Sequence, residues 1–286
     1  IPVIGIIPMT EIDIDDEDSL SSRLEENKNK AIKAIDIAVI RFDHISNFTD
    51  FNALSRIDSV SLRYVKRADE LKEPDIVILP GSKSTISDLI KLRESGLESR
   101  IMKLVEKGSM LIGICGGFQM LGKYIVDEEG VEYKGRVEGM GFLNAYTKFS
   151  TDKSLNNGVY KLNTKVGLCN GLSNTSVEGY EIHMGQTYSL GDDEQLLLEE
   201  DTKSDSQRVL GLINKKCFGT YLHGIFDNEE FTRNLLNKVA EKKGVELKED
   251  FLSTEDYKKR EYDKLADLVR NSLDMEKLYK ILDLKD

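Results

Sequence analysis

Short apolar runs alternate with segments of helical spacing through the first part of the chain. The runs at 35–42, 59–65, 75–80 and 110–114 are rich in β-branched and aliphatic residues and predict buried strands. Between the third and fourth runs, apolar residues recur every three or four positions, as in an amphipathic helix: Ile86, Leu89, Ile90, Leu97, Ile101, Leu104 and Val105. Buried strands that alternate with such helices predict a mostly parallel sheet with helices on both faces.

The pattern changes after about residue 130. The stretches "GRVEGMGFLNAYTKF" and "GVYKLNTKVGL" combine short strand-like pieces with Gly and Asn turns, which predicts antiparallel additions to the sheet. Residues 208–224 predict two more strands joined by a short turn near Asn214 and Lys215. Apolar residues return to helical spacing in 229–286, so carboxyl-terminal helices are expected there.

The first thirty residues differ from the rest. "IPVIGIIP" is typical of the last strand of a preceding domain, and "EIDIDDEDSLSSRLEENKNKAIK" is highly charged and without clear periodicity, as in a linker. We therefore expect the chain to be a piece of a longer protein. The predicted division is a tail and linker at 1–30, a main α/β domain at 31–228 and a helical extension at 229–286.

Composition narrows the function. Of the 286 residues, 40 are Lys or Arg and 51 are Asp or Glu, so the net charge is −11. This charge disfavours nucleic acid and anionic membrane surfaces as partners. The three cysteines are too widely spaced for a disulfide framework or a paired metal motif, which favours a reducing, cytoplasmic setting and predicts no metal. No long apolar span and no basic-then-apolar leader is present, so no membrane association is expected.

Cys115 is the leading candidate for chemistry, in "SMLIGICGGFQMLGKYI". It ends an apolar strand and precedes a helical segment, and Gly116 and Gly117 permit a tight turn and close approach of a substrate. Positive partial charge at a helix start favours a thiolate. The alternative is a small buried residue, which is the interpretation that we give to Cys169 and Cys217.

A thiolate nucleophile needs a base, and the chain has three histidines. His223 ends an apolar strand, so it could meet Cys115 where the carboxyl ends of the strands lie together. The turn "LPGSKST" after the strand at 75–80 offers backbone N–H groups for an oxyanion. A phosphate-binding loop is disfavoured because Gly81 lacks an upstream partner glycine, and the Ser and Thr residues are expected to cap the next helix.

Four stretches carry a resemblance: "LPGSKSTISDL", "GICGGFQMLG", "GYEIHMGQT" and "GTYLHGIFDN". In this order they resemble the class I glutamine amidotransferase portion of the cobyric acid synthase (CobQ) family, and "SNFTDF" and "SLRYV" are similar too. The resemblance covers about residues 31–286. It implies a flavodoxin-like fold and makes residues 1–30 the tail of the family's amino-terminal synthetase domain, with a linker. The rest of that domain, which is not in this chain, would need ATP and magnesium.

The resemblance also implies residue roles. Cys115 attacks the side-chain amide of glutamine, and His223 acts as base and then protonates the leaving ammonia. Gly81 or Ser82, together with Gly116, supplies N–H groups to the oxyanion. Gln119, one helical turn after the nucleophile, contacts bound glutamine. The ammonia then passes to the synthetase domain, which amidates peripheral carboxylates of a corrinoid, adenosylcobyrinic acid a,c-diamide.

This chain departs from ordinary triad amidotransferases, which carry His-Pro-Glu with the glutamate orienting the histidine. Here Gly224 and Ile225 follow His223, so another group must hold the second ring nitrogen. Glu181 and His183, in "YEIHMG", are candidates for lining the substrate site, or they are ordinary strand residues.

Two alternatives stay open. One is a non-catalytic docking or corrinoid-binding module that keeps the fold, for which the missing glutamate is the best support. The other is an amidotransferase with a different acceptor, such as the a,c-diamide synthase or the cell-wall glutaminase that amidates lipid II.

Overall fold

The computed structural model describes residues 3–10, 12–13, 32–163, 166–172, 175–191, 193–199, 209–247 and 254–282. The chain divides into two units, one of residues 18–251 and one made of the two ends, 1–17 and 252–286. Most of the predicted linker, residues 14–31, lies outside the described residues. The three-part division stays a prediction.

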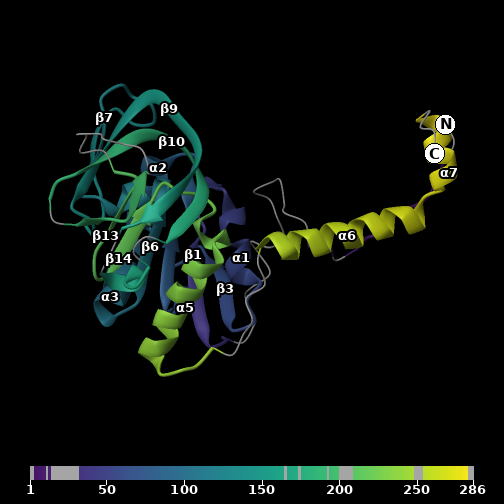
Figure 1. Ribbon diagram of the computed structural model, residues 1–286. Helices are drawn as coiled ribbons and strands as arrows, with labels where there is room; N and C mark the ends of the chain where they lie inside the picture. Colours follow the sequence, from purple (N-terminus) through teal and green to yellow (C-terminus); the bar gives the residue numbers. More distant parts are fainter. Residues whose placement is uncertain are drawn as a thin grey trace. The chain divides into compact units, whose positions relative to one another are not determined.

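A seven-stranded sheet forms the centre of the larger unit (Figure 1). Its strands, in spatial order, are β11 (Glu194–Gln195), β13 (Gly211–Ile213), β14 (Cys217–Thr220), β6 (Met110–Ile114), β4 (Ile76–Leu79), β1 (Ile35–Ile40) and β3 (Val60–Val65). The five from β3 to β14 are parallel, and β13 and β11 are antiparallel additions. In chain order the parallel strands run 2-1-3-4-5, which is the flavodoxin-like arrangement. The predicted fold class is confirmed.

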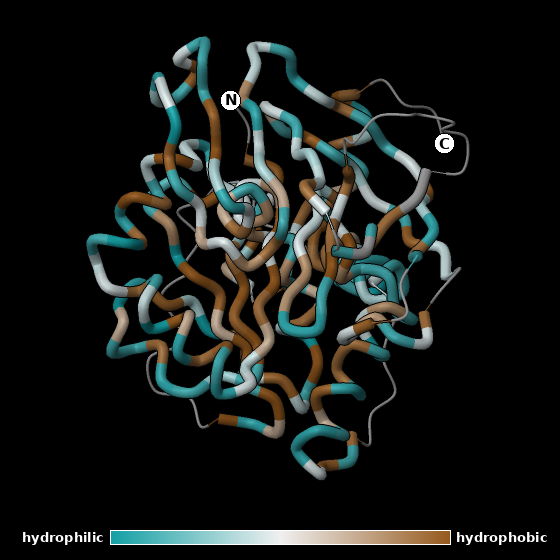
Figure 2. The backbone as a smooth tube through the Cα atoms, turned by 90° about the vertical axis from the view of Figure 1, so that its left-hand side faces the viewer, coloured by the Kyte–Doolittle hydropathy of each residue, from teal (hydrophilic) through white to brown (hydrophobic). Residues whose placement is uncertain are grey.

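Both faces of this sheet are covered, as its mostly apolar inner strands require. All six residues of β1 are buried, and successive side chains belong to opposite cores: Ile37 and Val39 pack on one face, Ala38 and Ile40 on the other. The first core includes α1 (Asn52–Ser55) and α5 (Glu229–Lys243), and the second α2 (Thr85–Glu94), α3 (Leu97–Lys107) and α4 (Gly116–Leu121). Figure 2 shows hydrophobic stretches concentrated in the inner strands and hydrophilic positions in the outer loops.

Two local expectations change in detail. The apolar pattern of 86–105 spans two helices, because Gly96 adopts a left-handed conformation (φ 77°) that ends one helix and starts the next. The strand-like pieces after residue 130 mostly build a second sheet of their own. Its strands are β10 (Ser176–Ser189), β9 (Ala145–Leu162), β7 (Tyr124–Asp127), β8 (Gly135–Glu138) and β12 (Leu197–Glu199).

The second sheet is separate because its longest strands pair with one another. β9 and β10 form an antiparallel ladder along most of their lengths, and the other edge of β9 pairs with β7 and β12. One irregularity interrupts the ladder between Met184 and Gln186, where Gly185 has a φ of 78°. This bulge turns the wall of β10 toward the carboxyl edge of the central sheet.

The smaller unit joins the two ends of the chain. Gly5 pairs with Leu273, and the Asp274 N–H donates to the Ile4 carbonyl at 2.7 Å, just after α6 (Thr254–Ser272) and before α7 (Met275–Ile281). Several apolar side chains of this unit are exposed: Val3, Ile6, Ile7, Met9, Tyr262, Tyr279, Ile281 and Leu282. No helix among the described residues combines the length and the apolar character needed to cross a bilayer.

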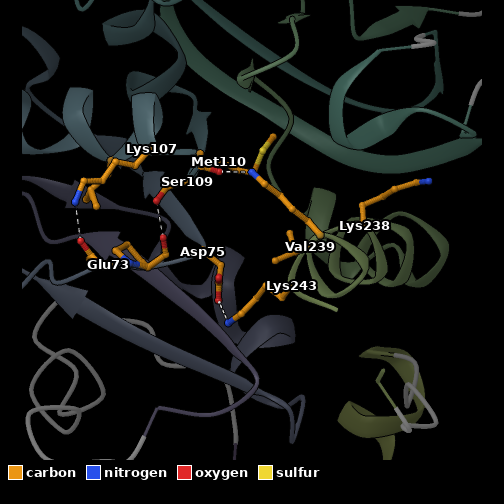
Figure 3. A pocket seen from close by; sticks show the side chains of 12 residues that line it. Glu73, Asp75, Lys107, Ser109, Met110, Lys238, Val239 and Lys243 are labelled. Carbon is orange, nitrogen blue, oxygen red and sulfur yellow. Dashed lines mark hydrogen bonds and ion pairs between the residues drawn. The ribbon is translucent and has the colours of Figure 1, made fainter. Parts of the chain in front are cut away.

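Two cavities lie at opposite ends of the parallel strands. One, of about 350 Å³, lies beyond the carboxyl ends and includes Cys115 and Gln119 in its lining. The other, of about 280 Å³, lies at the amino ends of β4 and β6 and is rich in lysine (Figure 3). Lys107 pairs there with Glu73 at 2.9 Å and Lys243 with Asp75 at 2.8 Å. These two lysine charges are therefore neutralised locally.

Candidate active site

Cys115 lies at a sharp turn between β6 and α4. Its φ of 51° and ψ of −108° fall outside the regions that side chains ordinarily occupy, so the strand-to-helix corner is strained. Its N–H donates to the Thr220 carbonyl at 2.8 Å, which continues the β6–β14 pairing up to the corner. The thiol contacts the Ile182 carbonyl at 3.6 Å and lines the larger cavity. The geometry is that of a nucleophile elbow.

The two glycines after Cys115 are required by close packing. A Cβ on Gly117 would lie 2.0 Å from the Leu79 carbonyl oxygen, so any side chain would force α4 away from β4. A Cβ on Gly116 would lie 3.0 Å from the Ser82 nitrogen. These contacts hold the elbow directly against the turn that follows β4.

His223 follows β14 and is 1% exposed. Its backbone is fixed by two hydrogen bonds to Tyr180 of β10, at 2.8 and 3.2 Å. The Tyr180 ring stacks on the imidazole, with ring centroids 5.0 Å apart and planes 20° from parallel. The ring is therefore held by a second strand as well as by its own.

Asp50 supplies the partner that the sequence left unidentified. Its Oδ2 accepts from His223 Nδ1 at 2.6 Å, and its Oδ1 accepts from the Gly224 N–H at 3.2 Å. Asp50 lies in a short 3-10 turn (Phe48–Phe51) after β1 and is itself buried. A carboxylate on Nδ1 fixes the tautomer and leaves Nε2 for chemistry.

The charge balance around His223 is unusual. Burial alone would lower the pKa of this imidazole, but Asp50 and the Cys115 sulfur raise it to about 10. Within the described part of the chain, Nε2 has no hydrogen-bond partner, although Cys115 is near enough to affect this pKa. The raised pKa thus favours an imidazolium whose Nε2 lies beside the Cys115 sulfur.

Backbone N–H groups converge beside the elbow. β5 (Gly81–Ser82) pairs with β2 (Ile45–Ser46), and the Lys83 N–H donates to the His44 carbonyl at 2.8 Å. Because hydrogen-bonded and open pairs alternate in an antiparallel ladder, the Ser82 N–H points away from β2. Gly116 begins α4, so its N–H has no acceptor within the helix. Of the two predicted alternatives, Ser82 is therefore the residue whose N–H is directed away from β2, and its nitrogen lies close to Gly116 at the elbow.

Comparison with known proteins decides the family. Residues 36–231, more than half of the chain, match the CobB/CobQ-like glutamine amidotransferase domain. The chain belongs to this family. Two cobyric acid synthases are 43% identical to it: that of Lachnoclostridium phytofermentans, covering 99% of this chain and 56% of the relative, and that of Ruminiclostridium cellulolyticum, covering 99% and 55%. The chain thus spans about half the length of the curated relatives that it matches.

Solved structures support the CobB/CobQ-like fold. A chain of PurLQS from Thermotoga maritima superposes with a TM-score of 0.57 at 20% identity, over 73% of this chain and 100% of that one. The crystal structure of a glutamine amidotransferase gives a TM-score of 0.53 at 22% identity, over 73% of this chain and 99% of that one. At these identities the likeness concerns the fold alone.

Gln119 of the amidotransferase domain lies on α4, one turn after the elbow, and is buried. Its Nε2 donates to the Met184 carbonyl at 2.9 Å and to the Tyr221 hydroxyl at 3.3 Å, and its Oε1 accepts from the Thr85 hydroxyl at 3.3 Å. Both amide protons are thus used within the protein. What remains for a ligand is acceptor capacity on Oε1.

Glu132 also lines the cavity, and the sequence offered no role for it. Its two oxygens accept from the N–H groups of Thr85 and Ile86, at 3.1 and 2.8 Å, and so cap α2. Ser84, at the expected cap position, makes no side-chain cap bond, so the prediction that Ser and Thr residues cap this helix was wrong. Burial raises the pKa of Glu132. The longer glutamate reaches both amides at once, and it adds a carboxyl group to the cavity.

Glu181 and His183 lie together on one face of β10, both buried, and only His183 lines the cavity. Their side chains bond to each other rather than pointing into open space: His183 Nε2 lies 3.2 Å from Glu181 Oε2. His183 thus lies in the cavity lining with Glu181 behind it, and the role of both in binding substrate stays a prediction. Cys169 and Cys217 are also buried, and burial raises the pKa of each thiol to about 12.

Asp50 was not among the residues predicted from the sequence to form the site, although it lies in the stretch "SNFTDF". The usable signal was an isolated carboxylate between Phe48 and Phe51, just after the first parallel strand, whose end shares an edge with Cys115 and His223. No group of three or more His, Cys, Asp and Glu side chains that could hold a metal occurs among the residues with described positions.

Proposed function

We propose that this chain is the glutamine-hydrolysing part of a cobyric acid synthase, with Cys115 as nucleophile, His223 as base and acid, and Asp50 as the residue that orients His223. The observation that carries the proposal is the arrangement of these three residues on the carboxyl edge of the parallel sheet. The short Asp50–His223 bond replaces the glutamate that ordinary triad enzymes carry after the histidine.

The first half-reaction releases ammonia. His223 holds the proton that Cys115 gives up, and the thiolate attacks the side-chain carbonyl carbon of glutamine. The carbonyl electrons move to oxygen, and the N–H groups of Ser82 and Gly116 stabilise the resulting charge. His223 then passes its Nε2 proton to the amide nitrogen, the carbon–nitrogen bond breaks, and ammonia leaves behind a γ-glutamyl thioester on Cys115.

The second half-reaction restores the enzyme. Neutral His223 takes a proton from water, the resulting hydroxide attacks the thioester carbonyl, and the carbon–sulfur bond breaks to give glutamate and the thiolate. The cavity supplies groups that suit an amino-acid substrate. The Glu132 carboxyl lies beside the α2 start, and Lys83 and Lys153 line the same cavity, so both charges of the glutamine backbone have complements.

This chain matches about half the length of its relatives, and the proposal extends to a synthetase domain in the other half. Ammonia made here would serve a synthetase domain that uses ATP and magnesium to convert corrinoid carboxylates to amides. Two observations support a partner of this kind: both 43%-identical relatives carry the name cobyric acid synthase, and the smaller unit of this chain exposes a set of apolar side chains, including Val3, Ile6 and Met9.

The test uses a glutamine-mimicking electrophile, 6-diazo-5-oxo-L-norleucine, which alkylates the nucleophile whether or not the isolated chain turns over rapidly. We expect one covalent adduct on Cys115 by mass spectrometry, slowed by excess glutamine, and no adduct in Cys115→Ser. Cys169→Ala is the matched control, since burial keeps that thiol out of reach. Wild-type protein that remains unlabelled would contradict the proposal.

The non-catalytic alternative loses its main support with Asp50, because that alternative rested on the absence of an orienting carboxylate. It would regain support if glutamine failed to protect Cys115 from the electrophile. An acceptor other than a corrinoid is tested separately, by supplying the purified synthetase part with each acceptor and measuring amide formation.

A further inference from the structure

The short strand β5 lies against both the proposed base and the nucleophile elbow. A Cβ built on Gly81 would lie 3.5 Å from His223 Cε1, and a Cβ on Gly116 would lie 3.0 Å from the Ser82 nitrogen. In the proposed mechanism the Ser82 N–H stabilises the oxyanion. The position of β5 therefore decides where this N–H lies relative to the thiol.

The backbone gives β5 little support of its own. β5 belongs to a sheet of two strands, and each of the two is only two residues long. The register pairs Ile45 with Ser82, and the Lys83 N–H adds one bond to the His44 carbonyl. An isolated pair of strands is at best marginally stable in water. Side-chain contacts must therefore help to fix β5 in place.

Asp88, in the first turn of α2, makes such a contact. Its Oδ2 accepts from the Ser82 hydroxyl at 2.7 Å and from the His44 N–H, just before β2, at 3.3 Å. Its Oδ1 contacts His44 Nδ1 at 3.0 Å. Asp88 is 1% exposed, so water competes little with these bonds. One buried carboxyl group thus holds both members of the β2–β5 pair.

The Ser82 hydroxyl is used on both sides. It accepts from the Ser84 N–H at 2.9 Å and donates its single proton to Asp88. The side chain of Ser82 is therefore fixed to the start of α2, although the residue lines the cavity. Its backbone N–H, which is directed away from β2, is left for the oxyanion.

The helix that carries Asp88 is a firm anchor. Its buried residues Leu89 and Leu92 belong to the second core of the central sheet. The Glu132 carboxyl accepts from the first two N–H groups of α2 and so fixes the start of the helix. Movement of Asp88 would therefore require movement of a packed helix.

We infer that Asp88 is a positioning residue, which acts through the Ser82 hydroxyl to hold β5, and thereby the Ser82 N–H, at the nucleophile elbow. The cavity lining includes Ser82 but not Asp88, so Asp88 acts from behind the site. The inference rests on the proposed function for the identity of the reaction. The Asp88–Ser82 bond itself is a property of the protein without substrate.

The first experiment measures the hold on β5 without substrate, by amide hydrogen exchange of residues 81–84 followed by mass spectrometry. Ser82→Ala and Asp88→Ala both remove the bond, so exchange at Lys83, which pairs with β2, should become about 10-fold faster. Ser84→Ala is the matched control in the same turn, because the Ser84 side chain makes no cap bond and its N–H is retained. Unchanged exchange in Ser82→Ala would overturn the inference.

The second experiment measures glutamine hydrolysis. Ser82→Ala keeps the backbone N–H but lets it move, so kcat should fall by roughly 10-fold with KM for glutamine within about 3-fold. Asp88→Ala should lower kcat by a similar factor, and the double variant should lose no more, because both changes remove the same bond. Asp88→Asn keeps an oxygen for the Ser82 hydroxyl and should recover most of the rate. Additive losses in the double variant would overturn the inference.

The third experiment separates this role from an effect on the thiol. Iodoacetamide alkylates Cys115 as the sulfur displaces iodide from carbon, so no oxyanion forms. Its rate in Ser82→Ala should stay within about 2-fold of the wild type although kcat falls. An equal fall in both rates would overturn the inference. Wild-type protein that 6-diazo-5-oxo-L-norleucine leaves unlabelled would instead contradict the proposed function, and the exchange result would stand.

Discussion

His223 and His183 form a natural comparison. Each is buried, each stacks on a tyrosine and each contacts a carboxylate. They differ in one nitrogen: His183 has an acceptor on both sides of the ring, whereas Nε2 of His223 has no partner among the described residues. Burial and a charged neighbour are therefore common to both rings, and the uncommitted nitrogen beside the Cys115 sulfur sets apart the histidine that we propose as the base.

The largest expected effect comes from removing the Asp50 carboxylate, which orients His223 but has no counterpart with the same role at His183. Asp50→Asn should lower kcat for glutamine hydrolysis on the order of 10²–10³-fold, because the amide permits the wrong tautomer and no longer stabilises the imidazolium. Steady-state ammonia release measures the change. Asp43→Asn is the control in the same loop, since the ion pairs that Asp43 makes among the described residues are with surface lysines, Lys66 and Lys91. Equal losses in both variants would count against the triad.

A second, smaller effect concerns stability and pH. The pKa of His223, about 10, lies above its ordinary value of 6.5, so the protonated form is bound more tightly in the folded state. The contribution of His223 to the free energy of unfolding is complete below about pH 6.5 and is lost as the pH rises through about 10. Asp50→Asn should therefore destabilise the protein more at roughly pH 6 than at roughly pH 10 in urea unfolding. A pH-independent difference would contradict this assignment.

The smallest expected effect on kcat concerns Tyr180, whose ring stacks on His223. Tyr180→Phe keeps the ring over His223 and should leave kcat within about 3-fold of the wild type. Tyr180→Leu removes the aromatic face and should lower kcat by about 10-fold, as expected for a ring pair worth on the order of 1 kcal/mol. The prediction fails if the phenylalanine variant is as impaired as the leucine variant.

The sheet and the nucleophile could be predicted from the sequence because their signals are local. The run Met110–Ile114 is uniformly apolar and breaks at Cys115 and two glycines, so strand, corner and helix follow from adjacent residues. The parallel strand 76–79 is likewise a continuous apolar stretch, and the strand 35–40 is apolar apart from Asp36. Local periodicity decides such elements whatever the rest of the chain does.

The parts that escaped prediction depend on contacts between distant segments. Asp50 reaches His223 across 173 positions, and Glu132 caps a helix that begins 47 positions earlier. The separate second sheet forms because β9 pairs with β10, and the alternation of apolar and polar residues does not specify which strands pair. In each case a side chain or strand has several equally suitable partners in the sequence, and only the packed fold selects one.

The wide separation of Asp50, Cys115 and His223 has a consequence for how the protein is made. β14 is the last of the parallel strands in chain order, and His223 follows it directly. On the mechanism proposed above, a partly synthesised chain therefore lacks the base for its thiol, and contacts between such distant segments require the closure of long loops. Unfinished protein would consume no glutamine and release no ammonia, so hydrolytic competence itself reports that the sheet is complete.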